Sequence, residues 1–165
     1  MLTIKANGIL KIKKKLKSAN LNIETLKERL ILQKKVIVIC GPTCTGKTRL
    51  AVHVAKLFNT DIISTDSMQV YRGMNIGTDK FNTEGYGIRQ YMIDILEPDY
   101  HLTAVEFRNI CRKIIEQEFF EKNKIPIIVG GSGLYIRAVI DNLEFTPEVS
   151  ADNGSIIYKV RENIK

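Results

Sequence analysis

The sequence predicts an α/β fold with three layers, in which helices cover both faces of a mainly parallel β-sheet. Two observations carry this prediction. Short β-branched runs alternate along the chain with segments of helical periodicity, and two of the runs end in glycine-rich turns that lead directly into a helix. The length of 165 residues and the hydrophobic content of 44% are typical of one globular domain with a core of its own.

The first strand, turn and helix are predicted between Lys35 and Phe58. The strand KVIVIC is followed by GPTCTGKT at 41–48 and then by KTRLAVHVAKLF, a helix with Leu50 and Val54 on one face. The turn fits G-x-x-x-x-G-K-[ST], the pattern of a P-loop, in which backbone N–H groups surround phosphate oxygens at the start of a helix. A glycine turn with a chance lysine is the alternative.

Several positions of this loop have an expected role in phosphate binding. Lys47 is expected to reach the terminal phosphate as a point charge, and the Thr48 hydroxyl to ligate a magnesium ion. A cysteine in such a loop can be a nucleophile, but no histidine stands beside Cys44 in the sequence, and we interpret it as a tolerated small residue. The residues expected to bind phosphate are Gly41, Pro42, Thr43, Cys44, Thr45, Gly46, Lys47 and Thr48.

The second strand is predicted in TDIIST at 60–65, and it delivers Asp66 at its carboxyl end. Because ligands of parallel α/β sheets bind outside the carboxyl ends of the strands, Asp66 and the P-loop are expected at the same rim. The residues alone leave three roles open for Asp66, namely a ligand contact, a helix cap or a magnesium ligand.

The clearest helix is predicted at 103–123, after the short apolar run YMIDILEP that Pro98 ends. Thr103 and Glu106 form a capping box at its start. Its apolar residues at helical spacing, which we expect in the core, are Phe107, Ile110, Ile114 and Phe119.

A third strand, within IPIIVGGSGLYIRAVI, returns the chain to the rim. The glycines at 130, 131 and 133 are expected to let the backbone approach a ligand closely before the next helix begins. Two glycine-rich turns are therefore expected to face one cleft.

Positive charge is concentrated near the amino end. Residues 1–35 contain ten lysines and arginines against two glutamates, an excess of eight, so that residues 36–165 carry −1 of the net charge of +7. The run KIKKKLK is either a solvated arm, which we favour, or an RNA-binding or targeting segment. The core therefore offers little positive field of its own for nucleic acid.

The cysteines and the hydropathy predict an intracellular protein. Three cysteines are an odd number without metal-ligand spacing, which indicates reduced thiols. No segment is apolar enough to cross a membrane. We expect a cytoplasmic location, with the mitochondrion as the alternative because residues 1–23 contain no acid.

Four segments together resemble one protein family. GPTCTGKT, DIISTDSMQVYRGMNIGT, IDILEP and IPIIVGGSGLYIRAVI, in this order and spacing, are similar to the amino-terminal half of tRNA dimethylallyltransferases, also called tRNA isopentenyltransferases. The resemblance covers about Lys35 to Pro147. It implies a P-loop NTPase-like core that uses dimethylallyl diphosphate rather than ATP, together with Mg²⁺. It also implies transfer of the dimethylallyl group to N6 of an adenosine beside the tRNA anticodon.

The resemblance also implies roles for particular residues. Asp66 would accept a hydrogen bond from N6–H and act as general base, and the Ser132 hydroxyl would hydrogen-bond near the reacting centre, with a turn residue as its alternative role. The P-loop would bind the diphosphate, and Lys47 with magnesium would offset charge on the leaving oxygens. The residues implied to contact the tRNA are Asp66, Ser67, Met68 and Gln69.

Departures from the family pattern define further expectations. Family members are nearly twice as long, and their second half supplies a helical insertion, basic tRNA contacts and an arginine near the diphosphate. We interpret residues 1–34 as a basic extension, 35–147 as the prenyltransferase core and 148–165 as the start of the helical insertion. Gln90 and Tyr91 stand where the family commonly has two histidines. We expect a monomer, a short form of the enzyme that binds tRNA weakly alone.

Three alternatives to this enzyme stay open at the level of the sequence. A small-molecule kinase would use the P-loop for ATP, but no arginine-rich lid segment is evident. An adenylate prenyltransferase would modify a free nucleotide. An inactive binding protein would keep the fold and lack acceptor recognition.

Overall fold

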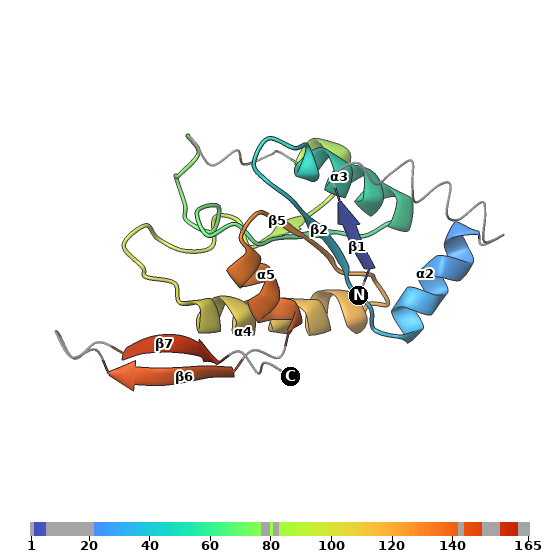
Figure 1. Ribbon diagram of the computed structural model, residues 1–165. Helices are drawn as coiled ribbons and strands as arrows, with labels where there is room; N and C mark the ends of the chain where they lie inside the picture. The colour runs from blue at the N-terminus through green and yellow to red at the C-terminus, as the bar shows by residue number, and fades with distance from the viewer. Residues whose placement is uncertain are drawn as a thin grey trace.

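Figure 1 shows the computed structural model of the chain, which describes residues 2–5, 22–76, 80, 83–141, 144–149 and 156–161. In chain order the elements are β1 (Leu2–Lys5), α2 (Ile23–Leu32), β2 (Ile37–Cys40), α3 (Lys47–Phe58), β3 (Ile62–Ser64), the 3₁₀ turn η1 (Glu84–Tyr86), β4 (Gln90–Tyr91), α4 (Ala104–Ile114), the π-helix η2 (Ile115–Phe120), β5 (Ile127–Gly130), α5 (Gly133–Ile140), β6 (Glu144–Val149) and β7 (Ile156–Arg161).

Five strands form one parallel sheet in the order β1-β2-β5-β3-β4. β5 lies at its centre, where Ile127 is in register with Ile37 of β2 and with Ile62 of β3. Because paired strands run in the same direction, β2, β3 and β5 end at the same rim of the sheet. The predicted α/β class with a mainly parallel sheet is confirmed.

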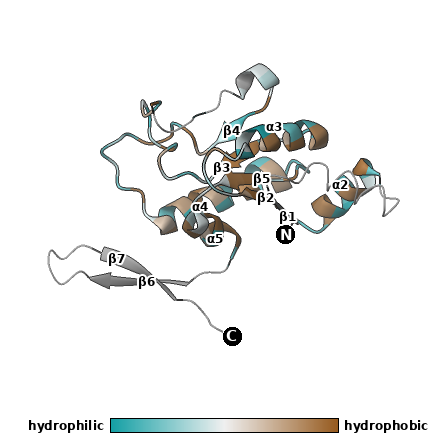
Figure 2. Cartoon of the chain, turned by 45° about the horizontal axis from the view of Figure 1, so that its top comes forward, coloured by the Kyte–Doolittle hydropathy of each residue, from teal (hydrophilic) through white to brown (hydrophobic). Residues whose placement is uncertain are grey.

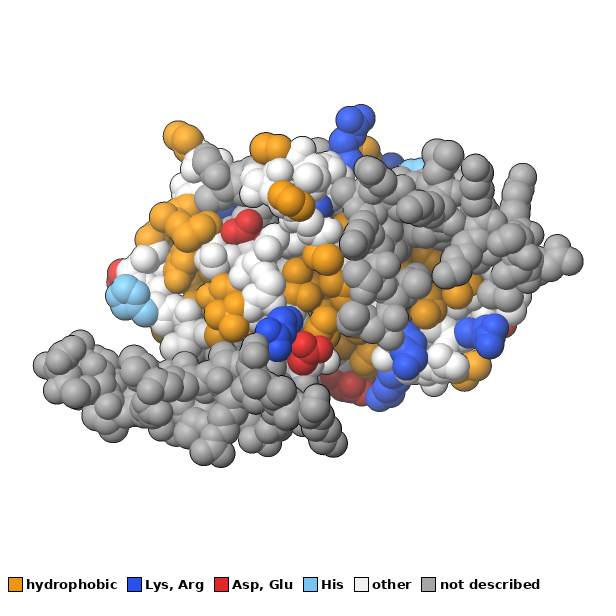
Figure 3. Space-filling model, in the orientation of Figure 1, with side chains coloured by type: hydrophobic (Ala, Val, Ile, Leu, Met, Phe, Trp, Pro, Cys, Tyr) orange, Lys and Arg blue, Asp and Glu red, His pale blue; other side chains and the backbone are white. Residues whose placement is uncertain are grey.

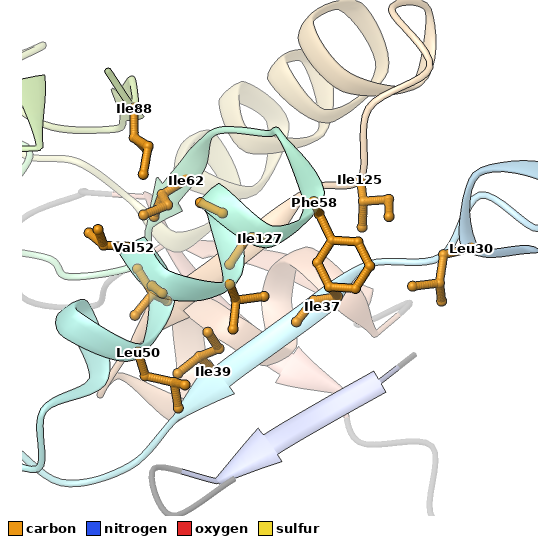
Figure 4. Packing of buried hydrophobic residues seen from close by; sticks show 14 residues of the cluster. Leu30, Ile37, Ile39, Leu50, Val52, Phe58, Ile62, Ile88, Ile125 and Ile127 are labelled. Atoms are coloured by element: carbon orange, nitrogen blue, oxygen red, sulfur yellow. The ribbon is translucent and has the colours of Figure 1, made fainter. Parts of the chain in front are cut away.

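An apolar cluster lies on each face of the sheet and is covered by helices. The fold therefore has three layers, helix–sheet–helix, as predicted. Ile62 and Ile127 pack with Phe58 of α3 on one face of the sheet (Figure 4). Ile63 and Ile128 belong to a second cluster, on the face covered by α4 and α5. Figure 2 shows the resulting hydrophobic band along the central strands, between α3 on one side and α4 and α5 on the other.

The long predicted helix divides into α4 and the π-helix η2. The capping box is present, since Glu106 N–H donates to Thr103 Oγ1 (3.2 Å) and Thr103 N–H donates to Glu106 Oε2 (2.9 Å). Phe107 and Phe119 are fully buried. Ile114 and Phe119 are five residues apart, a spacing that fits the i→i+5 bonding of a π-helix better than an α-helix.

The amino end contributes two elements that the sequence did not predict. β1 pairs in parallel with β2 at the edge of the sheet, from Leu2 opposite Ile37 to Lys5 opposite Cys40. Leu30 of α2 belongs to the core cluster on the α3 face. The run KIKKKLK lies outside the described residues. The division at residue 35 stays a prediction, but deletion of residues 1–34 would remove an edge strand and part of the core.

The described residues near the carboxyl end form a β-hairpin. β6 and β7 are antiparallel, with Glu144 opposite Arg161 and Val149 opposite Ile156. The start of a helical insertion at 148–165 stays a prediction, and the described residues of that range, 148–149 and 156–161, form strands. The physical reason is composition, because IIYKVR is rich in β-branched and aromatic residues that favour strands.

The face drawn in Figure 3 mixes hydrophobic, polar and charged side chains. Three large apolar side chains in the segment after Asp66 are exposed, namely Met68, Met74 and Ile76. Within the part of the chain that the structure describes, helices are too short or too polar to cross a lipid bilayer.

Candidate active site at the carboxyl rim of the sheet

The P-loop closes on itself through two hydrogen bonds to one carbonyl group. Lys47 Nζ donates to the Pro42 oxygen (2.6 Å), and Thr45 Oγ1 donates to the same oxygen (2.8 Å). Cys44 and Gly46 have left-handed backbone, with φ of 61° and 77°. This conformation costs a residue other than glycine about 1 kcal/mol, so the loop holds some strain at Cys44. An anion that enters the loop would compete with Pro42 for the Lys47 ammonium.

A cavity of about 200 Å³ lies at the carboxyl rim. It brings together three segments that are distant in sequence, which are the P-loop, the residues after β3 and the glycine turn after β5. This arrangement is the one that the rim argument predicts. The predicted site residues that line the cavity are Thr43, Cys44, Lys47, Thr48, Asp66, Met68 and Gln69.

Other predicted residues lie near this cavity without lining it. Ser132 occupies the N-cap position of α5, and its side chain makes no capping hydrogen bond. Its neighbour Gly131 does line the cavity, and a Cβ at Gly131 would be 3.5 Å from the Gly41 oxygen, so the two turns are adjacent. The predicted residues that are not part of the lining are Gly41, Pro42, Thr45, Gly46, Ser67 and Ser132.

The carboxylate of Asp66 is held by the backbone that follows it. Asp66 Oδ1 accepts a hydrogen bond from the Met68 N–H at 2.9 Å, and the side chain is half-buried. Residues 67–70 form turns, so Asp66 is not a helix cap. Asp66 also lines the cavity, so its oriented carboxylate can contact a ligand there.

Two hydroxyl groups anchor the segment that carries Asp66. The buried Ser64 donates its hydroxyl hydrogen to Gln69 Oε1 at 2.8 Å. Thr65, which is fully buried, donates to the Val129 oxygen at 3.2 Å. Both bonds tie the residues after β3 to the sheet, which fixes the position of the carboxylate relative to the P-loop.

Gly130 is required for strand packing, and it also lines the cavity, so its predicted role in ligand approach stays a prediction. A Cβ at this position would lie 2.2 Å from Thr65 Oγ1 and 2.9 Å from the Thr65 carbonyl oxygen. β5 therefore passes close to β3 only because residue 130 has no side chain. At Gly133 a Cβ would meet no atom within 4 Å.

Two neighbours on β4 point to opposite faces of the sheet. Tyr91 packs against Phe119 and donates its hydroxyl hydrogen to Glu118 Oε2 at 2.9 Å. Burial, reinforced by this bond, raises the pKa of Tyr91 to about 12. Gln90 lines the cavity instead. Sequence reasoning did not assign Gln90 to the site, and the only signal was its departure from the family's histidine.

Ser64, Gln90 and Val129 are lining residues that sequence reasoning missed. Ser64 and Val129 belong to strands whose sequence predicts only burial, and Gln90 begins a two-residue strand that the sequence did not predict. The polar contact of Ser64 appears only once the segment after β3 has folded back. No local pattern separates such residues from ordinary core positions.

Thr48, the predicted magnesium ligand, lies at the rim. Among the described residues, no group of three or more His, Cys, Asp or Glu side chains could hold a metal. The hydroxyl of Thr48 lines the cavity together with Lys47. Mg²⁺ keeps several waters and binds substrate phosphates with few protein ligands, so this donor set fits the ion.

The thiols of Cys44 and Cys111 should differ sharply in reactivity. Cys44 is exposed, whereas Cys111 is fully buried, and burial raises the pKa of Cys111 to about 12. Because the thiolate is the reactive form, we expect a maleimide at pH 8 to modify Cys44 in the folded chain and Cys111 only after denaturation. Peptide mapping by mass spectrometry measures both sites. Equal labelling of the two would contradict the described packing of α4.

Comparison with known proteins identifies the family. The sequence model of a family described as IPP transferase matches residues 69–164. The chain belongs to the IPP transferase family. The match begins three residues after Asp66 and includes β4, α4, β5 and α5, whereas the P-loop and Asp66 precede it.

Curated relatives and solved structures of IPP transferases agree with this assignment. A protein of Bacillus mycoides named tRNA dimethylallyltransferase is 49% identical over 119 residues, covering 72% of this chain and 37% of the relative. A crystal structure of tRNA delta(2)-isopentenylpyrophosphate transferase from Staphylococcus epidermidis is 53% identical, with a TM-score of 0.62, over 67% of this chain and 37% of that chain. One from Bacillus halodurans is 42% identical, with a TM-score of 0.63, over 72% and 39%. The chain thus spans less than two fifths of the length of these IPP transferases.

Proposed function

We propose that this chain carries the donor site and the general base of a tRNA dimethylallyltransferase. Such an enzyme transfers a dimethylallyl group from dimethylallyl diphosphate to N6 of an adenosine beside the tRNA anticodon. The observation that carries the proposal is one cavity that joins Lys47 and Thr48 of the P-loop to Asp66. The names of the relatives, which are tRNA-modifying transferases, support the choice of substrates.

The P-loop is proposed to bind the diphosphate. Lys47 would exchange its bond to the Pro42 oxygen for a charge-assisted bond to a phosphate oxygen. Backbone N–H groups at the start of α3 would donate to the other oxygens. Thr48 would hold Mg²⁺ together with diphosphate oxygens and waters. When bound, the ion supplies positive charge that stabilises the leaving diphosphate.

Asp66 is proposed to activate the acceptor. Its carboxylate would accept the N6–H of adenine and take the proton as nitrogen forms a bond to the allylic carbon. The carbon–oxygen bond breaks at the same centre, and its electron pair leaves with the diphosphate. Because Asp66 lies in a cavity at the sheet rim, the adenine would be flipped out of its stack to reach it. Ser67, Met68 and Gln69 would then lie beside the nucleotide.

The charge distribution supports weak binding of tRNA by this chain. Residues 36–165 carry a net charge of −1, whereas phosphate contacts normally position an RNA before its bases are recognised. The remaining length of the relatives could supply such contacts. A tRNA substrate would place the chain where tRNA is modified, in the cytoplasm or the mitochondrion.

Replacing Lys47 by Ala tests the donor site. We expect the affinity for dimethylallyl diphosphate in the presence of Mg²⁺ to fall about 10- to 100-fold, because a hydrogen bond to a charged group contributes about 1.5–3 kcal/mol. Isothermal titration calorimetry measures this change. The thermal midpoint should stay unchanged, since Ala is a strong helix former and Lys47 begins α3.

Arg49→Ala is the matched control, because it removes one charge from an exposed position of the same helix that does not line the cavity. Its donor affinity should equal that of the wild type. Unchanged affinity in Lys47→Ala would contradict the assignment of the P-loop. Tighter binding of ATP than of dimethylallyl diphosphate by the wild-type chain would favour a kinase instead.

A further inference from the structure

Gln90 is half-buried, and its amide oxygen is a buried polar atom whose presence the fold does not explain. Its side-chain oxygen Oε1 is inaccessible to solvent and, within the described residues, is the buried side-chain atom that has no hydrogen-bond partner. An unpaired buried oxygen costs free energy, and an apolar side chain of similar length would avoid the cost. Such an atom in a native protein needs an explanation, and a hydrogen bond from a bound ligand is one that a functional site provides.

The strand register directs Gln90 towards the cavity rather than the core. Gln90 lies opposite Ile62, whose side chain packs on the α3 face of the sheet. Ser64 is two residues beyond Ile62 and therefore faces the same side. Gln90 and Ser64 both line the cavity, together with Asp66. The amide of Gln90 is thus part of the wall that faces the reacting carboxylate.

The chemistry of the substrates decides which ligand can donate a hydrogen bond to the Gln90 amide oxygen. The diphosphate oxygens are hydrogen-bond acceptors and cannot donate to this oxygen. The dimethylallyl group has no hydrogen-bonding atoms. The adenine amino group offers two N–H donors, of which Asp66 needs one. Glutamine is complementary to the edge of adenine, since its oxygen accepts from N6–H while its nitrogen donates to N7. Rotation about the last side-chain bond brings either end of the amide to face the cavity.

We propose that Gln90 binds the N6–N7 edge of the acceptor adenine and is a specificity-determining residue of the transfer reaction. This inference rests on the proposed function and adds a second contact to the amino group that Asp66 deprotonates. Gln90 and Asp66 would hold the amino group from two sides, which orients the nitrogen lone pair towards the allylic carbon.

Gln90→Met tests the proposal, because methionine has similar length and no hydrogen-bonding amide. The full chain is saturated with Mg²⁺ and an unreactive thio analogue of dimethylallyl diphosphate, and adenosine and inosine are then titrated by NMR. We expect the adenosine affinity to fall about tenfold and the preference for adenosine over inosine to shrink. Donor affinity should stay within about twofold. The thermal midpoint should be equal to or above that of the wild type, since the unpaired oxygen is gone.

Two further variants separate a ligand contact from a structural role. Gln90→His keeps a ring nitrogen that can accept a hydrogen bond, and it should recover part of the adenosine affinity. Gln117→Met makes the same change at an exposed position of η2 and should leave both affinities unaltered.

The outcomes distinguish failure of this inference from failure of the proposed function. A wild-type chain that does not bind dimethylallyl diphosphate refutes the proposed function. A chain that binds the donor but not adenosine at millimolar concentration overturns the role of Gln90. The same conclusion follows if Gln90→Met loses both ligands equally, lowers the thermal midpoint or keeps its full preference for adenosine.

Discussion

Replacing Asp66 by Asn is expected to slow dimethylallyl transfer about 10²- to 10⁴-fold while leaving donor affinity unchanged. The amide oxygen of asparagine can still accept the Met68 N–H that Asp66 Oδ1 accepts at 2.9 Å, so the turn should persist. An amide cannot take up the proton of the acceptor amine. The rate is measured under single-turnover conditions, with labelled dimethylallyl diphosphate and an RNA hairpin that carries the anticodon loop.

Asp99→Asn is the control for charge, since Asp99 is exposed and does not line the cavity. This variant should transfer at the wild-type rate. If Asp66→Asn instead lost donor affinity and transfer rate in equal measure, Asp66 would serve the metal or the fold and not the proton transfer.

Gly130→Ala is expected to destabilise the chain by about 3 kcal/mol or more, the largest effect on stability that we predict for a single methyl group. The added Cβ would lie 2.2 Å from Thr65 Oγ1 and 2.9 Å from a backbone oxygen, and neither strand can move without breaking the centre of the sheet. Urea denaturation followed by circular dichroism measures the free energy of unfolding.

Gly133→Ala provides the comparison, because its Cβ would meet no atom within 4 Å and it starts helix α5. We expect this variant to be as stable as the wild type or slightly more stable. A Gly130→Ala protein that keeps its stability and loses donor affinity would show instead that this glycine makes room for a ligand.

The parts of the site that sequence predicts are those that local patterns encode. The P-loop is a contiguous motif between a strand and a helix, and the Thr103–Glu106 capping box spans four residues. The position of Asp66 needed one further rule, that parallel strands end at the same rim. This rule held because β2, β3 and β5 are adjacent in the sheet.

The remaining features depend on contacts between distant segments. The clash that keeps residue 130 a glycine exists only because β5 pairs beside Thr65, far away in sequence. Gln90 belongs to a strand of two residues, too short for an alternating pattern to indicate which face it occupies. β1 is four residues long and is followed by a lysine-rich stretch, so its pairing with β2 has no strong local signal.

The central position of β5 has a consequence for how the chain is made. β2 and β3 do not pair with each other, and each finds its inner partner only in residues 127–130. During synthesis on a ribosome, the pairs β1–β2 and β3–β4 therefore have unpaired backbone groups on β2 and β3 until β5 emerges. Such non-local pairing makes folding slow. A nascent chain that ends before residue 127 has no continuous sheet and would be a substrate for chaperones or proteases.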